Sequence, residues 1–173
     1  MSDKNKLSSE IIELINTLNK VSSLSEEIEK VTSVITECIK SGKKIMICGN
    51  GGSAAEANHL AAEFLIRLKP DNNRAAIPII SLSQNSSVLT ACGNDLGFEN
   101  IFSRTLEGLG NSGDVLISLS TSGNSKNVLN AIIAAKNKKI KTVSFLGEKG
   151  GTAKNFSDIN ILIPSENVAR IQE

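Results

Sequence analysis

Apolar residues recur with the spacing of helices along the first part of the chain. One face of the first predicted helix carries Leu7, Ile11, Leu14, Ile15 and Leu18. This is the periodicity of an amphipathic helix. A second helix follows the serine-rich break at 22–25, and its apolar residues are Leu24, Ile28, Val31, Ile35 and Cys38. Their steps of four and three resemble a heptad seam, which is typical of a helix packed against other helices.

The second helix has recognisable ends. Ser25, followed by Glu26 and Glu27, predicts a capped and acidic start, and Ser41-Gly42 predicts the end. Two interpretations of these helices stay open: they cover the domain's own sheet, or they pack between subunits. The length of the seam before the first strand favours subunit packing. We therefore expect one domain over 1–173, with a helical oligomerisation segment at 1–41 and an α/β body at 42–173.

Beyond Gly42 the pattern changes to alternating strands and helices. The expected strands are 44–48, 77–81, 114–119, 140–146 and 159–163, and the expected helices are 53–68, 86–92, 100–108 and 125–138. The strands are continuous apolar runs such as VLISL and TVSFL, as expected for strands covered on both faces. The sequence thus predicts an α/β fold with a doubly wound, five-stranded parallel sheet of the flavodoxin-like kind. In such sheets, ligands bind at the carboxyl ends of the strands.

The first strand leads into the most informative segment, IMICGNGGSAAEANHLAAE, at 45–63. Its glycine turn is followed by a helix start at Ser53, a combination that can hold an anion because backbone N–H groups and the helix dipole converge there. His59 and Glu63 are four residues apart and share one face of that helix. They are candidates for acid/base or metal chemistry, although an ordinary ion pair on a helix surface remains an alternative.

A dinucleotide site must also be weighed, because Gly49, Gly51 and Ala54 fit the pattern G-x-G-x-x-G/A. That site needs an acidic residue at the end of the second strand. Ser81-Leu82-Ser83 follows the second strand here and supplies no carboxylate. The nucleotide P-loop fails as well, since no Gly-Lys-Ser/Thr closes the turn. A turn with a purely structural role stays open.

The third strand is followed by a cluster of hydroxyl residues, STSGNS at 120–125. Ser125 is the expected N-cap of the next helix. Hydroxyls and backbone N–H groups at a helix start form a second anion site without any cation. A turn that only caps the helix is the alternative. The small polar turn Gly93-Asn94-Asp95 can contact sugar hydroxyls, but an ordinary Asn/Asp turn explains it about as well.

Composition narrows the possible partners. The chain has a formal net charge of +1 and no Trp or Tyr, so neither a nucleic-acid site nor an anionic membrane surface is expected. No apolar run approaches the ~20 residues needed to span a bilayer, and the start MSDKNK is not typical of a signal peptide. The three cysteines are scattered in apolar surroundings, as in reduced core thiols, so we expect a cytoplasmic protein.

Together, GNGGSAAEANHLAAE, TACGNDLGFE, ISLSTSGNS and the terminal ARIQE resemble the sugar isomerase (SIS) family in their order and spacing. The resemblance runs from about Lys43 to Glu173, and His59, Glu63 and RIQE place it in the heptose branch. It implies an aldose–ketose isomerase that converts sedoheptulose 7-phosphate to D-glycero-D-manno-heptose 7-phosphate through an enediol, for the heptoses of bacterial surface glycans such as lipopolysaccharide. It also implies a homotetramer.

The resemblance also assigns the site residue by residue. Glu63 is the implied base, and His59, Glu63 and Gln172 are implied ligands of one zinc per subunit. The implied phosphate contacts are Ser120, Thr121, Ser122 and Ser125. The implied sugar contacts are Asn50, Gly51, Gly52, Glu63, Asn94, Asp95 and Gln172, with Arg67 nearby.

The family carries a further histidine after RIQE, as fourth zinc ligand and acid partner, whereas His59 is the only histidine here. We therefore expect the sequence to stop inside its final helix. A binding protein of the same fold branch, which associates with the bacterial replication initiator, is the alternative function. That relative lacks the carboxylate at Glu63 and has Arg in place of Ser122, so both positions favour the isomerase.

Overall fold

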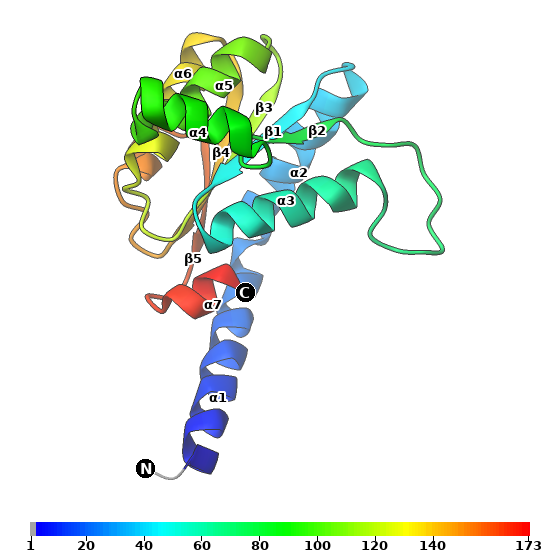
Figure 1. Cartoon of the computed structure of the whole chain (residues 1–173). Coiled ribbons are helices and arrows are strands. Elements are labelled where there is room, and N and C mark those ends of the chain that lie inside the picture. Colours follow the sequence, from blue (N-terminus) through cyan, green and yellow to red (C-terminus); the bar gives the residue numbers. More distant parts are fainter. Residues whose placement is uncertain (1–2) are drawn as a thin grey trace.

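The computed structural model describes residues 3–173 and has one sheet between two layers of helices (Figure 1). The helices are α1 (Asp3–Val21), α2 (Ser25–Lys40), α3 (Gly52–Leu65), α4 (Ser86–Asp95), α5 (Ile101–Leu109), α6 (Lys126–Asn137) and α7 (Val168–Gln172). The strands are β1 (Ile45–Gly49), β2 (Ile79–Ser81), β3 (Val115–Ser120), β4 (Lys141–Gly147) and β5 (Ile159–Ile163). Short 3-10 turns lie at Ser22–Leu24, Phe98–Asn100 and Ala153–Asn155.

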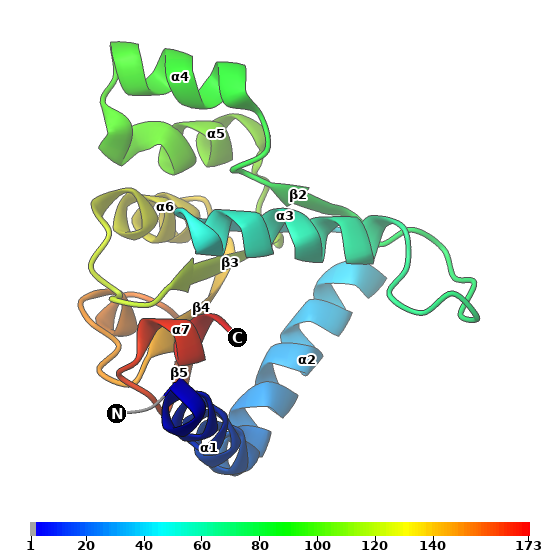
Figure 2. The ribbon, with the colours of Figure 1, turned by 60° about the horizontal axis from the view of Figure 1, so that its bottom comes forward.

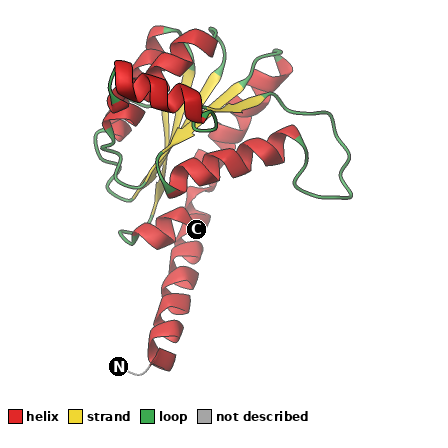
Figure 3. Cartoon of the chain, viewed as in Figure 1, coloured by secondary structure: helices red, strands yellow, loops and turns green. Residues whose placement is uncertain are grey.

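All five strands are parallel, in the order β2-β1-β3-β4-β5 (Figure 3). This confirms the predicted doubly wound sheet of the flavodoxin-like kind. The strand order reverses between β1 and β3, which pair from Ile45↔Val115 to Gly49↔Leu119. The segments that follow β1 and β3 therefore emerge side by side at the carboxyl edge. In sheets of this kind, that switch point is where ligands bind.

Two separate apolar cores fix the sheet between its helices. On one face, Met46 and Leu116 pack with α4, α5 and α6 around the fully buried Phe102 and Leu106. On the other face, the alternate strand residues such as Ile47 and Ile117 pack against α2 and α3. Figure 2 shows the two layers on opposite sides of the strands. Each strand is apolar on both faces for this reason.

The two N-terminal helices differ in how they use their apolar faces. Val31 and Cys38 of α2 are buried against the chain's own sheet, with Leu24 and Ile35 packed beside them. The α2 seam therefore covers the chain's own sheet for most of its length, while Ile28 of the same seam is exposed. The first helix extends away from the body (Figure 1), and its apolar stripe is exposed at Leu7, Ile11, Ile15 and Leu18.

Several element boundaries differ from the predicted ones. Leu24 occupies the N-cap position of α2 with no side-chain cap bond, so the predicted cap by Ser25 is wrong, whereas Ser41 and Gly42 end the helix as predicted. Helix α3 ends at Leu65, before the segment with Pro70, and β2 begins only after Pro78. Within residues 3–173, no helix combines the length and apolar character that a bilayer span requires.

Candidate active site at the switch point of the sheet

The turn after β1 needs glycine at position 51 and comes close to α7 at position 52. Gly51 has φ +55°, a backbone conformation that residues with a Cβ rarely adopt. It occupies the N-cap position of α3 and accepts the first helical N–H groups, from Ala54 and Ala55, at 3.0 and 3.1 Å. At Gly52, an added Cβ would lie 2.8 Å from Nε2 of Gln172. The turn thus brings the backbone close to the C-terminal helix.

The turn after β3 is folded around its own hydroxyl groups. The Ser120 hydroxyl accepts a hydrogen bond from the Gly123 N–H at 3.1 Å, and the Ser122 hydroxyl accepts one from the Asn124 N–H at 3.2 Å. Ser125 is the N-cap residue of α6, as predicted, but makes no side-chain cap bond. The start of α6 therefore keeps N–H groups and the positive end of its dipole for another partner. This geometry suits an anion.

The loop between β4 and β5 supports the turn after β3. The Asn124 side-chain oxygen accepts hydrogen bonds from both the N–H and the hydroxyl of Thr152, each at 2.9 Å. The Ala153 N–H donates to the Gly123 carbonyl at 2.9 Å. Gly123 has φ +64° and lies directly against the Gly150 backbone. Sequence reasoning missed this support, although the segment GEKGGT at 147–152 carries the signal of a tight glycine loop.

A pair of amides joins the turns after β1 and β3. Asn50 and Asn127 donate to each other's side-chain oxygens, and both hydrogen bonds are 2.8 Å long. Asn127 belongs to the first turn of α6 and is almost completely buried. It was not among the predicted site residues. No spacing rule connects it with Asn50, because the two residues meet only through the parallel pairing of β1 and β3.

His59 and Glu63 lie together on α3, as their spacing predicts. His59 Nε2 is 3.7 Å from Glu63 Oε1, which is longer than a hydrogen bond. The imidazole is largely exposed, whereas the Glu63 side chain is 23% exposed and its second oxygen, Oε2, is buried without a hydrogen-bond partner. An unpartnered buried carboxylate oxygen is costly to maintain. Oε2 therefore has its lone pairs free to accept a hydrogen bond, a proton or an ion.

Gln172 approaches the start of the same helix rather than the His59–Glu63 pair. Its amide lies against Gly52, and His59 and Glu63 follow about two and three turns later, or roughly 10 and 16 Å along the helix axis. Gln172 also lines a groove of about 650 Å³ between α2, α3, α7 and the sheet, together with Ser120 and Thr121. One copy of the chain therefore brings Gln172 to the two turns and leaves His59 and Glu63 apart.

The remaining predicted residues lie on the periphery. Asn94 and Asp95 are exposed at the end of α4, and the Asn94 amide donates to the Asp95 carboxylate at 2.8 Å. Arg67 lies beyond the end of α3, where it donates to the Pro70 carbonyl at 2.9 Å. Its guanidinium is therefore used to shape an exposed loop. The structure gives no direct contact, among its described residues, between these three side chains and the two turns.

The residues fit a zinc ion only in part. His59 and Glu63 supply an imidazole and a carboxylate with an unpartnered oxygen, which are suitable ligands. Within residues 3–173, however, no group of three or more His, Cys, Asp and Glu side chains comes together to hold a metal. Gln172 does not complete the set within one copy. A single chain therefore presents two neighbouring ligands rather than a closed tetrahedral site.

Cys48, which lies in β1 one residue before its end, has no chemical role at the turn. It is completely buried, and burial raises the pKa of its thiol to about 12. The thiol therefore stays protonated and unreactive at neutral pH. Its function is packing in the core beneath the turn. This agrees with the expectation that the cysteines are core thiols.

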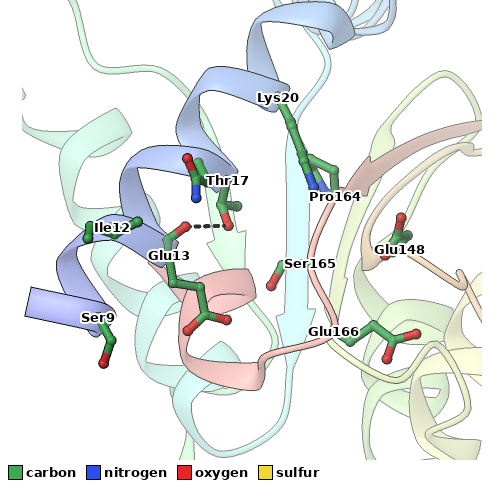
Figure 4. Close-up of a pocket in the computed structure, with 10 residues that line it drawn as sticks. Ser9, Ile12, Glu13, Thr17, Lys20, Glu148, Pro164, Ser165 and Glu166 are labelled. Carbon is green, nitrogen blue, oxygen red and sulfur yellow. Dashed lines mark hydrogen bonds between the residues drawn. The ribbon is translucent and has the colours of Figure 1, made fainter. Parts of the chain in front are cut away.

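A second hollow, of about 480 Å³, lies between α1 and the end of β5 (Figure 4). Its wall is polar and includes Glu13, whose carbonyl accepts a hydrogen bond from the Thr17 hydroxyl at 3.0 Å. The Asn167 amide donates to both carboxylate oxygens of Glu13, at 3.1 and 3.0 Å. These contacts fasten α1 to the segment before α7. The hollow contains none of the predicted site residues.

Comparison with known proteins agrees with this architecture. The SIS domain model matches residues 11–147, most of the chain. The chain belongs to the SIS domain family. This SIS protein is 47% identical to the phosphoheptose isomerase of Clostridium acetobutylicum over 86% of its own length and 74% of that protein. It is 48% identical to the phosphoheptose isomerase of Nitratiruptor sp. over 95% and 87% of the two chains.

The fold extends the comparison to a solved structure. Phosphoheptose isomerase GmhA from Neisseria gonorrhoeae superimposes with a TM-score of 0.91 at 33% identity, over 99% of this SIS protein and 91% of that chain. The long N-terminal helix and the five-stranded sheet are both included in a match of that extent. The resemblance to the heptose branch of the family is thereby confirmed. The SIS protein is an aldose–ketose isomerase of the phosphoheptose isomerase type.

Proposed function

We propose that this SIS protein converts sedoheptulose 7-phosphate to D-glycero-D-manno-heptose 7-phosphate. One observation supports this proposal most strongly. A chain that is 47% identical to a phosphoheptose isomerase has, at the switch point of its sheet, a turn after β3 that is lined with hydroxyl groups and suits an anion. The predicted catalytic carboxylate and the predicted phosphate contacts are all present. The product would supply heptose for bacterial surface glycans such as lipopolysaccharide.

The phosphate would bind at the turn formed by Ser120, Thr121, Ser122 and Ser125. Support comes from the uncapped start of α6 and from the absence of competing side-chain capping by Ser125. The hydroxyl oxygens of Ser120 and Ser122 already accept backbone N–H groups, so their O–H groups can donate to phosphate oxygens. Asn50, Gly51 and Gly52 would face the sugar from the turn after β1. Asn94 and Asp95 remain proposed sugar contacts without a supporting interaction in one copy.

Glu63 would act as the general base. Its carboxylate takes a proton from C1 of the ketose, and the C1–C2 enediol forms as the C2 carbonyl oxygen is protonated. Glu63 then returns the proton to C2 while the C1 hydroxyl gives up its own proton and becomes the aldehyde, so the proton taken up at the C2 oxygen is balanced by the one released from the C1 oxygen. The unpartnered Oε2 atom supports this role, because a carboxylate oxygen without protein donors is free to accept a proton.

The active site would form between subunits of a homotetramer. Two observations support self-association: the exposed apolar stripe of α1, and the separation of Gln172 from His59 and Glu63 along α3. A second copy would bring its Gln172 and phosphate turn to the His59–Glu63 pair of the first. Segment 1–41 would then serve assembly mainly through α1, and 42–173 would carry the substrate.

A zinc ion would be held by His59 and Glu63 of one subunit and Gln172 of another. When bound, zinc polarises a carbonyl or hydroxyl oxygen as a Lewis acid. We place the reaction in the cytoplasm, and the three cysteines support a reducing compartment because all are unpaired and buried.

The decisive experiment measures the conversion of sedoheptulose 7-phosphate by the purified protein, with incorporation of deuterium at C1 and C2 followed by NMR in deuterated water. We expect turnover accompanied by solvent exchange, as an enediol mechanism requires. Ribose 5-phosphate and fructose 6-phosphate serve as shorter controls. Absence of turnover and exchange with the heptose would contradict the proposal. Light scattering on the same sample tests the tetramer, and a stable monomer in an active preparation would contradict assembly at the site.

A further inference from the structure

Asn127 is a buried polar residue outside the proposed set of substrate contacts. It lies in the first turn of α6, directly after the proposed phosphate turn, and is 2% exposed. Its amide reaches across the switch point to Asn50, in the turn after β1. Figure 2 shows the starts of α3 and α6 facing the same edge of the sheet. Among the described hydrogen bonds, the only partner of the Asn50 side chain is therefore Asn127, which is itself buried.

The hydrogen-bonding capacity of the two amides is used unequally. The Asn127 oxygen accepts both the Asn50 amide at 2.8 Å and the Val128 N–H at 2.9 Å, so its two lone pairs are occupied. Asn50 uses one N–H and one lone pair in the pair and is only partly buried. One N–H and one lone pair of Asn50 are left over. That remaining combination of donor and acceptor matches a hydroxyl group, which both donates and accepts.

The pairing also restricts which way Asn50 can turn. A single hydrogen bond would let the amide pivot, whereas two antiparallel bonds of equal length fix its plane and the positions of its oxygen and nitrogen. The Val128 N–H, an otherwise unsatisfied donor of the helix start, fixes Asn127 in turn. Helix α6 therefore fixes the orientation of the Asn127 amide, and the Asn127 amide fixes that of the Asn50 amide.

We propose that Asn127 is a positioning residue of the isomerase site, which presents the Asn50 amide to a hydroxyl of the sugar in register with the phosphate turn. The role rests on the proposed function and deepens it. Asn127 couples the two ends of the substrate: the phosphate at the turn after β3, and the hydroxyl-bearing carbons beside the turn after β1. Misplacing a contact by about 1 Å can cost as much as 10²-fold in rate.

A double-mutant cycle tests this role with Asn127→Ala, Asn50→Ala and the double variant, each assayed for kcat and KM with sedoheptulose 7-phosphate and for Ki of inorganic phosphate. We expect Asn127→Ala to lower kcat/KM by about 10- to 100-fold. In the Asn50→Ala background, the same substitution should change kcat/KM by less than about threefold, because its target is gone. The Ki of phosphate should stay within about threefold, since the serine turn is intact.

Asn130→Ala is the matched control. Asn130 lies on the same helix, and its amide donates to the Glu99 carbonyl at 2.9 Å, away from both turns. Its loss should lower the melting temperature by less than Asn127→Ala does, because Asn130 is less buried, and kcat/KM should stay within about twofold of wild type.

Three results would overturn the positioning role. In the first, the fold-losses of kcat/KM in the two single variants multiply fully in the double variant. In the second, the Ki of phosphate rises in parallel with the fall in kcat/KM, which indicates that the start of α6 has lost its structure. The third is wild-type kcat/KM in Asn127→Ala. If the wild type is active and any of these results is found, the positioning role is rejected but the proposed function still holds. A wild type that neither binds nor converts the heptose overturns the function and the positioning role together.

Discussion

The two turns at the switch point and the His59–Glu63 pair on α3 are held in very different ways. The turns are fixed by hydrogen bonds from within and from neighbouring segments: the Asn50–Asn127 pair on one side and the Asn124–Thr152 contacts on the other. The pair on α3 is separated by 3.7 Å, half open to solvent, and includes a buried oxygen without a partner. One copy of the chain thus holds the proposed phosphate and sugar turns rigidly, whereas the proposed catalytic pair keeps an unpartnered oxygen.

This difference between the two regions matches the different physical requirements of ligand binding and of proton transfer. A binding turn must exist before the ligand arrives, because preorganised donors lose little entropy when they engage it. A general base must instead keep a lone pair free for the substrate proton. Substitutions in the two regions should therefore change different kinetic quantities.

The largest effect is expected at the proposed catalytic pair. Glu63→Gln keeps the length of the side chain but removes the basic oxygen, and should lower kcat by about 10²- to 10⁴-fold, or ~3–5 kcal/mol of barrier. Stability should change by less than ~1 kcal/mol. KM and phosphate Ki should change little, because the proposed phosphate turn lies after β3 and does not include Glu63. Steady-state kinetics with and without added zinc, and deuterium exchange at C1, measure the effect.

The exposed Glu29 of α2 gives the matched control for that experiment, since Glu29→Gln removes the same charge from another helix at a solvent-exposed position. It should leave kcat within about twofold of wild type. Near-normal turnover and exchange in Glu63→Gln would show that another residue is the base. The proposed division between a binding region and a catalytic region would then be wrong.

The next effect concerns the turn after β3. Ser122→Arg puts a long side chain at the proposed phosphate position and removes the oxygen that accepts the Asn124 N–H. Losing hydrogen bonds to a charged group should raise KM and phosphate Ki by about 10- to 100-fold. Ser122→Ala, with no added bulk, should raise them by less than about tenfold. Unchanged KM and Ki in Ser122→Arg, with a normal melting temperature, would place the phosphate elsewhere.

A smaller effect is expected where the turn after β1 meets α7. In Gly52→Ala the new Cβ would lie 2.8 Å from Gln172 Nε2, so the flexible Gln172 side chain must move away. We expect a fall of about three- to tenfold in kcat/KM, and a melting temperature close to that of wild type, because Ala suits a helix. Gly108→Ala on α5 is the control, since nothing lies within 4 Å of its added Cβ. Equal activity of both variants would show that the contact with Gln172 is dispensable.

The smallest effect on activity is expected at the amino edge of the sheet. Asp114 is buried; burial alone would raise the pKa of its carboxyl, but hydrogen bonds from Lys44 Nζ at 2.5 Å and from the Asn111 and Lys44 N–H groups lower the pKa overall. Its contribution to stability is therefore present above the unfolded pKa of ~3.9 and is lost as the pH falls through the lowered folded pKa.

Asp114→Asn should lower the free energy of unfolding at pH 7 by about 1–3 kcal/mol and flatten its dependence on pH below ~4, with kcat/KM near wild type. Urea unfolding monitored from pH 3 to pH 7 measures both changes. An unchanged acid dependence would show that the carboxyl does not contribute. A large loss of activity in the folded variant would instead link the amino edge to the site.

Sequence reasoning recovered most of the fold because the signals were local. The continuous apolar runs predicted all five strands within a few residues, and the serine and glycine turns lie at the ends of β1 and β3, the two strands at the switch point. The capping of α2 was missed because a serine can begin a helix without capping it. The sequence left open what covers the α2 seam, because heptad-like spacing shows that one face is buried but not which surface buries it; Val31 and Cys38 pack on the chain's own sheet.

The amino-acid sequence by itself therefore determined the strands of the sheet, the two turns after β1 and β3, and the His59–Glu63 pair, because each depends on residues that are close in sequence. Only the tertiary structure decided what joins them. Parallel pairing of β1 and β3 brings Asn50 to Asn127, the loop after β4 closes on Asn124, and α7 sets Gln172 against Gly52 rather than against Glu63. These contacts join residues far apart along the chain, and no periodicity or spacing encodes them, because they depend on how the strands are ordered and how the helices are laid across them.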